Sequence, residues 1–182
     1  MKKILKLTFI LFLVCAVTAG ILGFVNVITA DRIEAQNIAK TKKAYASVLK
    51  SEEYEDLPFD KSVPEFAHIN TIAKASNGAG YVVVSSFSGA QGKITMATGV
   101  DNDMKCTGIS IISHSETSGL GANAASTGEV GISFRSQFVG QDESIALKKS
   151  GGEIDALTGA TITSRSVTSA VAEAIRAVEA LG

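Results

Sequence analysis

The longest apolar run of the chain lies at its N-terminus, from Leu7 to Ile28, and it contains no charged residue. A helix needs about 20 such residues to cross the hydrocarbon core of a membrane. Lysines precede the run at Lys2, Lys3 and Lys6, and the first charged residue after it is Asp31. This bias predicts a single-pass protein of the cell membrane with a cytoplasmic N-terminus and an extracytoplasmic C-terminal domain.

A cleaved signal peptide is the alternative interpretation of the same run. The segments Val17–Ala19 and Ile28–Ala30 both end in a small residue of the kind found at cleavage sites. The apolar core of a signal peptide is only about 7–15 residues long, so the length of this run favours a retained anchor.

A looser apolar pattern continues through residues 31–50. Its members recur at approximately helical spacing, and they are Ile33, Ile38, Tyr45, Val48 and Leu49. We expect a stalk helix that continues the membrane helix and packs on the domain that follows. Residues 51–66 contain both prolines of the chain and are interpreted as an irregular connection.

Three runs rich in β-branched and aromatic residues follow, at Tyr81–Phe87, Lys93–Val100 and Cys106–His114. Residues 88–92 and 101–105 separate them and are rich in residues that favour turns. Asp101–Asp103 lacks the remaining spacing of a calcium-binding loop and is interpreted as part of a turn. Because short loops join antiparallel neighbours, the pattern predicts an antiparallel meander.

The clearest helix is predicted at Ser164–Leu181. Its apolar residues fall on one helical face, namely Val167, Val171, Ala174, Ile175, Val178 and Leu181. Residues 117–131 are expected to form a long loop, a feature that is usually functional in a compact domain, and residues 132–140 a short element. The predicted fold class is α+β, an antiparallel sheet with packed helices preceded by one N-terminal transmembrane helix.

The composition of the chain argues against several classes of function and site. A net charge of −1 argues against a nucleic-acid-binding protein, which would carry a clustered basic face. Cys15 lies in the apolar run, so Cys106 is the only cysteine left in the outer domain and can form no internal disulfide there. With no Cys/His cluster, no metal site is expected, and Cys106 is interpreted as a small buried residue of a strand.

A cluster of hydroxyl residues precedes the C-terminal helix at Thr158, Thr161, Thr163 and Ser164. Such residues at a helix start usually act as caps that satisfy free backbone N–H groups. The same free N–H groups and the helix dipole also make a seat for a phosphate. The residues alone leave both interpretations open.

The stretch Asp155–Ser164, with the sequence DALTGATITS, resembles the flavinylation motif of the FMN-binding domain family. In that family a flavin transferase links the phosphate of FMN to the threonine of a Gly-Ala-Thr triplet. The resemblance implies a phosphoester at Thr161, with Thr158, Gly159 and Ala160 completing the motif. Asp155 matches the acidic position of the motif, and the resemblance implies that the transferase recognises it.

A second stretch, His114–Ser126, resembles the His-x-Glu-Thr-Pro-Gly-Leu-Gly loop of the same family, with Ser118 where proline is usual. The matching residues are Glu116, Thr117, Gly119, Leu120 and Gly121. The resemblance makes this loop a wall of the flavin site. For Glu116, a place beside the flavin and an ordinary loop-ordering role are both left open.

Both motifs, their order, the anchor and the terminal helix are similar to the family of G subunits of Rnf-type ion-translocating oxidoreductase complexes, which pass electrons between ferredoxin and NAD. This implies an electron-transfer subunit with covalent FMN and no catalytic residue of its own. It also implies partners: other membrane subunits of the complex, the membrane through residues 7–28, and a flavin transferase during maturation. The expected domains are an anchor at residues 1–30, a stalk and connection at 31–66 and a covalent FMN-binding domain at 67–182.

Other functions remain as alternatives. One is the C subunit of a sodium-translocating NADH:quinone reductase, another a stand-alone extracytoplasmic flavin carrier, and a third a membrane-anchored adaptor without redox chemistry. The glycines of Gly119–Ala124 could also suggest a dinucleotide-binding fingerprint with Asp142. That fingerprint needs a helix that begins at the glycines inside a βαβ unit, and no helical periodicity follows Ala125.

Overall fold

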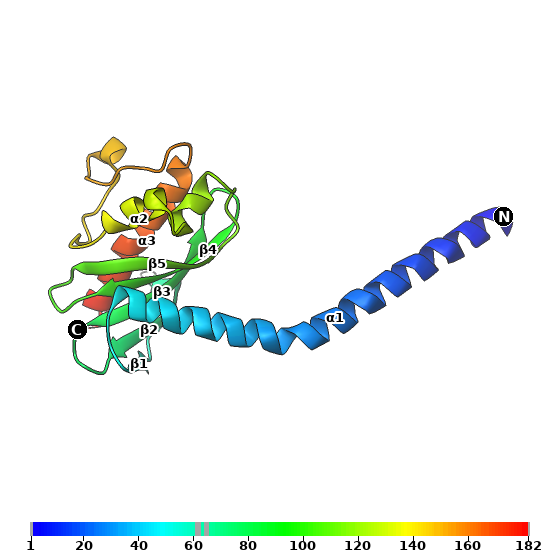
Figure 1. Cartoon of the computed structure of the whole chain (residues 1–182), viewed down its shortest axis with the longest axis horizontal. Coiled ribbons are helices and arrows are strands. Elements are labelled where there is room, and N and C mark those ends of the chain that lie inside the picture. The colour runs from blue at the N-terminus through cyan, green and yellow to red at the C-terminus, as the bar shows by residue number, and fades with distance from the viewer. Residues whose placement is uncertain (1, 61–62, 64–65, 182) are drawn as a thin grey trace. The chain divides into compact units, whose positions relative to one another are not determined.

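The computed structural model describes residues 2–60, 63 and 66–181, in two compact units formed by residues 1–40 and residues 41–182. The longest element is helix α1, Lys2–Val48, which enters both units and is drawn from blue to cyan in Figure 1. Within the first unit, Lys3–Ala30 has a mean hydropathy of 2.5 and exposes its apolar side chains. The segment predicted to cross the membrane is therefore helical, as expected. Its length and composition suit the hydrocarbon core of a membrane.

In the second unit, the described residues form an antiparallel sheet of five strands in the order β1-β2-β3-β4-β5 (Figure 1). The strands are β1 Tyr54–Leu57, β2 Ile69–Ala75, β3 Tyr81–Ser88, β4 Lys93–Val100 and β5 Cys106–His114. The predicted meander is confirmed for β3, β4 and β5, each antiparallel to its neighbour in the sequence. With helices packed on this sheet, the chain has the predicted α+β class.

Strands β1 and β2 were not predicted from the sequence. Strand β1 lies inside the segment interpreted as an irregular connection, and its Glu55 and Asp56 are exposed at the edge of the sheet. Charged side chains at such an edge discourage pairing with another chain, but they hide the strand from a hydrophobicity pattern. In β2 the core-facing positions include Ala73 and Ala75, and alanine has a low strand propensity.

Two hydrophobic clusters cover the two faces of the sheet, because successive residues of a strand point to opposite sides. Helix α3, Thr161–Glu179, packs on the first face, and every predicted apolar position within it is buried; Leu181 lies beyond the end of the helix and is partly buried. The end of α1 packs on the second face, where Tyr45 and Val48 contact the cluster of Val82 and Val84. The predicted stalk helix therefore packs on the domain through its last residues.

Helix α1 packs against the sheet at a pair of glycines. Gly99 of β4 and Gly108 of β5 are cross-strand partners, and both lie next to Val48. A Cβ atom at Gly99 would lie 2.6 Å from the carbonyl oxygen of Val48, so only glycine fits. The Thr107 hydroxyl donates a hydrogen bond to the same oxygen. The helix end thus approaches the strands more closely than any side chain would allow.

The chain beyond β5 contains short helices where the sequence predicted mostly loop. These are the 3-10 helix η2 Gly121–Ala125, helix α2 Glu129–Ser136 and the 3-10 helix η3 Lys148–Ser150. The expectation that no helix directly follows the loop ending at Ala125 was wrong, and the short element predicted at residues 132–140 begins earlier. A dinucleotide fingerprint is still unsupported, because the described strands around the loop pair antiparallel and form no βαβ unit.

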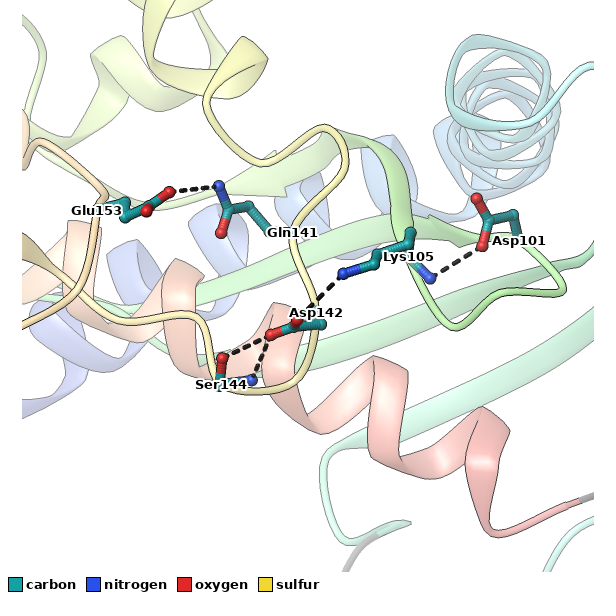
Figure 2. A network of polar contacts seen from close by, with 6 residues as sticks. All are labelled: Asp101, Lys105, Gln141, Asp142, Ser144 and Glu153. Atoms are coloured by element: carbon teal, nitrogen blue, oxygen red, sulfur yellow. Dashed lines mark hydrogen bonds and ion pairs between the residues drawn. The ribbon is translucent and has the colours of Figure 1, made fainter.

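A polar network fixes the segment that returns from α2 (Figure 2). Asp142 accepts hydrogen bonds from the backbone and hydroxyl of Ser144 and pairs with Lys105 Nζ at 3.1 Å. The backbone of Lys105 in turn donates to the Asp101 carboxylate in the turn before β5. Next to it, Cys106 exchanges backbone hydrogen bonds with residues 140 and 141. Cys106 is buried, as predicted, and burial raises the pKa of its thiol to about 12.

The network predicts an acid-sensitive contribution of Asp142 to stability. Hydrogen bonds from Ser144 and the charge of Lys105 lower the pKa of Asp142 from 3.8 to about 2. A carboxylate whose pKa is depressed in the fold stabilises it above the unfolded pKa and loses that effect as the pH falls towards 2. We expect Asp142→Asn to lower the urea midpoint at pH 7, with a smaller difference at pH 3. Equal midpoints at pH 7 would contradict this role.

Candidate functional site

The flavinylation-like motif forms the turn that leads into α3. Gly159 adopts a left-handed conformation, with φ of 72°, which favours glycine. Ala160 is the residue before the helix, and its N–H donates to the carbonyl of Leu157 at 3.0 Å. The helix begins at Thr161, three positions earlier in the chain than the predicted start at Ser164. Thr161 is therefore the first residue of α3.

The hydroxyl side chains of this turn do not cap the helix, so the cap interpretation was wrong. Thr163 is fully buried and donates its hydroxyl proton to the carboxylate of Glu116. Ser164 is also fully buried. It donates to the carbonyl of Ala160 and accepts from the N–H of Leu157, both at 2.9 Å. Both hydroxyls are thus committed to internal structure.

Thr158 and Thr161 behave differently. Thr158 is exposed and Thr161 is half-buried, and within the described part of the chain neither hydroxyl makes a hydrogen bond. Ser164 is the first residue of α3 whose N–H reaches a carbonyl of the preceding turn, that of Ala160. The N–H groups of the first helical turn have no partner inside a helix, so they are open to an anion. Thr161 therefore combines an accessible hydroxyl with a helix N-terminus.

Glu116 joins this turn to the rest of the domain. The side chain is 9% exposed, and it accepts hydrogen bonds from Thr163 and from the backbone N–H of Gln91. Burial by itself raises the pKa of Glu116, but the hydrogen bonds from Thr163 and the turn around Gln91 outweigh it and lower the pKa. The carboxylate thereby holds the β3–β4 turn, the loop after β5 and the start of α3 together. This is the loop-ordering role that the sequence left open.

The other loop residues lie against the same turn. A Cβ atom at Gly159 would lie 2.9 Å from the Leu120 side chain, so the two loops touch at this point. Gly121 is packed between Glu116 and Thr163, where a larger residue would clash with both. Thr117 stabilises the loop, because its carbonyl accepts hydrogen bonds from the N–H groups of Leu120 and Ala122.

Two exposed apolar side chains lie near Thr161. Leu120 is 44% exposed on one side of the turn, and Ile162, next to Thr161 in the helix, is 61% exposed. Gly119, with φ of 77°, allows the loop to turn before Leu120. A phosphate at the helix N-terminus and the face of a flat aromatic ring beside Leu120 and Ile162 are both compatible with these residues, so they fit FMN. Ile162 was not singled out from the sequence, because one apolar residue in a helical pattern carries no signal of exposure.

Asp155 lies at the other end of the motif. Its carboxylate is exposed and pairs with Lys148 Nζ at 2.6 Å, while its backbone is hydrogen-bonded to the side chain of Gln137. Gln137 follows α2 directly. Two residues before it, Arg135 donates to the carbonyls of Ala124 at 2.7 Å and Ser126 at 2.9 Å. The sequence indicated none of these contacts, since they join segments far apart in the chain.

The contact of Thr163 with Glu116 predicts a stability defect. Thr163→Val keeps the shape of the side chain but leaves a buried carboxylate without its hydroxyl donor, a loss of about 1–3 kcal/mol. Because the pKa of Glu116 is lowered in the fold, this stabilisation is present above the unfolded pKa and lost as the pH falls below it. Urea unfolding at pH 7 measures the defect, with Thr161→Val as the matched control. Equal stability of the two variants would contradict the assigned role.

Comparison with known proteins gives matches over the whole chain. Residues 89–176 match the family described as the FMN-binding domain, and residues 1–48 match the family described as the RnfG N-terminal region. A solved structure of the C subunit of a Na(+)-translocating NADH-quinone reductase from Parabacteroides distasonis is 18% identical, with a TM-score of 0.48. It covers 75% of this chain and 79% of its own, a similarity too low to compare the two proteins residue by residue.

Two relatives are similar along nearly their entire length. The G subunit of the Na(+)-translocating ferredoxin:NAD(+) oxidoreductase complex of Acetobacterium woodii is 34% identical, over 99% of this chain and 94% of that protein. The G subunit of the ion-translocating oxidoreductase complex of Methanosarcina acetivorans is 32% identical, over 98% of this chain and 96% of that protein. With an FMN-binding domain behind an apolar N-terminal helix, the chain belongs to the family of G subunits of ion-translocating oxidoreductase complexes of the Rnf type.

Proposed function

We propose that this protein is the membrane-anchored electron-transfer subunit of an Rnf-type complex and carries FMN through a phosphoester to Thr161. The proposal rests on which hydroxyl groups of the motif are buried and hydrogen-bonded and which one is accessible. Thr163 and Ser164 are buried and bonded internally, whereas Thr161 is accessible at the start of α3. The FMN-binding family match includes this turn.

The helix start supports attachment at Thr161 rather than at Thr158. A phosphodiester carries a negative charge, which the free N–H groups and the positive dipole end of α3 would stabilise. Thr161 lies in the first helical turn, whereas Thr158 precedes the left-handed Gly159 and lies outside it. Gly159 and small Ala160 leave room next to the hydroxyl.

Bound FMN would supply one- and two-electron chemistry, and the chain would hold it, tune it and exclude water from one side. Thr161, with Thr158, Gly159 and Ala160, would hold the phosphate end. Leu120 and Ile162 would give the ring an apolar surface, and Gly119 and Thr117 would fix the loop that presents Leu120. Glu116 would support the site indirectly, because its carboxylate already accepts hydrogen bonds from Thr163 and from the β3–β4 turn.

The membrane helix supports a role in assembly rather than in ion transfer. Intramembrane ionisable side chains usually mark ion paths, and residues 7–28 contain none; Asn26 is among the most polar residues there. We propose that α1 binds other membrane subunits of the complex, with the N-terminus in the cytoplasm and the FMN-binding domain outside. A flavin transferase would act on the motif there, recognising Asp155.

Peptide mass spectrometry on protein from its native host tests the attachment. Trypsin cleavage after Lys149 and Arg165 releases the peptide Ser150–Arg165, which contains the whole motif. We expect a mass increase of one FMN minus water, located at Thr161, and its complete loss in Thr161→Ala. Ser150→Ala, which removes an exposed hydroxyl of the same peptide outside the motif, is the matched control and keeps the modification. An unmodified wild-type peptide in cells that contain the transferase, or a flavin on another residue, would contradict the proposal.

A further inference from the structure

The side chain of Gln137 makes two hydrogen bonds with the backbone of Asp155, one as acceptor and one as donor. The N–H of Asp155 donates to Gln137 Oε1 at 2.7 Å, and Gln137 Nε2 donates to the carbonyl of Asp155 at 3.4 Å. A carboxamide that accepts from an N–H and donates to a carbonyl of the same residue imitates the pairing of two strands. It ties the end of α2 to the first residue of the motif.

This contact is the main restraint on the backbone of Asp155. Ile154 is held by a bridge to Leu147, and Leu157 is held by Ser164, on either side of it. Among the described residues, the backbone of Asp155 makes hydrogen bonds only with Gln137. The ion pair with Lys148 is a weaker restraint, because its side chains are 58% and 65% exposed and exposed pairs contribute little.

The same end of α2 also holds the loop on the other side of the site. Arg135 donates to the carbonyls of Ala124 and Ser126, which closes the loop that carries Leu120. A groove of about 340 Å³ lies between α2 and the motif, lined among others by Val130, Phe134 and Thr158. The C-terminal end of α2 therefore positions both segments, while leaving the Asp155 carboxylate exposed.

We propose that Gln137 is a positioning residue for flavin attachment, which fixes the backbone of Asp155 so that the carboxylate is presented to the flavin transferase. The inference rests on the proposed function. It implies that the transferase acts on a motif whose shape is set by α2. Gln137 acts through Asp155, and its proposed role requires no contact with the flavin.

The test measures covalent flavin incorporation into the full-length protein in detergent by a purified flavin transferase, with its flavin donor in excess. In-gel flavin fluorescence gives initial rates at several concentrations of the protein substrate. Gln137→Met removes both hydrogen bonds at similar length and is expected to lower kcat/KM about 2- to 10-fold, the effect of one or two hydrogen bonds. The loss appears as a raised KM with kcat and the melting temperature unchanged.

Two variants make the test specific. Gln137→Glu keeps the acceptor of the 2.7 Å hydrogen bond and is expected to recover most of the kcat/KM that Gln137→Met loses. Gln141→Met is the matched control, because Gln141 donates to Glu153 and, among the described residues, makes no hydrogen bond with Asp155. In an Asp155→Ala background, Gln137→Met is expected to have no further effect, since a residue that acts through Asp155 is coupled to it.

The outcomes separate this inference from the proposed function. If the wild-type protein takes up no flavin, or Thr161→Ala takes up as much, the proposed function is wrong and this inference with it. If the wild type is flavinylated at Thr161 but Gln137→Met has an unchanged kcat/KM, only the positioning role is wrong. A fully additive effect in the Asp155→Ala background would likewise overturn it.

Discussion

The candidate site depends on one buried carboxylate. An ionised side chain that leaves water must be fully hydrogen-bonded, because burying an uncompensated charge is costly. Glu116 meets this demand with the Thr163 hydroxyl and the N–H groups of the β3–β4 turn. The residues packed against the carboxylate must also lack side chains, because a Cβ at Gly89 or Gly121 would clash with it. The position of the α3 start against the loop after β5 follows from this contact.

The same contact distinguishes the hydroxyls of the motif. Thr163 faces the core because its hydroxyl is needed there, and Ser164 holds the turn through Leu157 and Ala160. Residues two positions apart on a helix point in different directions, so burying Thr163 leaves Thr161 at the surface. A sequence of adjacent hydroxyls thus separates into structural and accessible members once one of them is fixed to Glu116.

The sequence predicted the parts of the fold in which pattern and burial agree. The N-terminal helix is a continuous apolar run, strands β3 to β5 are rich in β-branched residues, and α3 has one apolar face. It failed for β1, whose exposed Glu55 and Asp56 suit an edge strand, and for α2, which is a short helix with only Gly131 and Phe134 buried. For the site, the motif located Thr161 and the loop. The roles of Gln137 and Arg135, and the contact of Thr163 with Glu116, could not be found, because contacts between separate segments of the chain leave no local pattern.

The central claim is a phosphoester between FMN and Thr161, and phosphorus NMR of the protein purified from its native host tests it most directly. Free FMN, including FMN released by denaturing the protein, is a phosphate monoester with a second pKa of about 6, as in other phosphate monoesters, so its resonance shifts between pH 5 and 8. A phosphodiester has no such ionisation. We predict a resonance that does not move over this range and is absent from Thr161→Ala. A resonance that titrates, or one that persists in Thr161→Ala, would contradict the attachment.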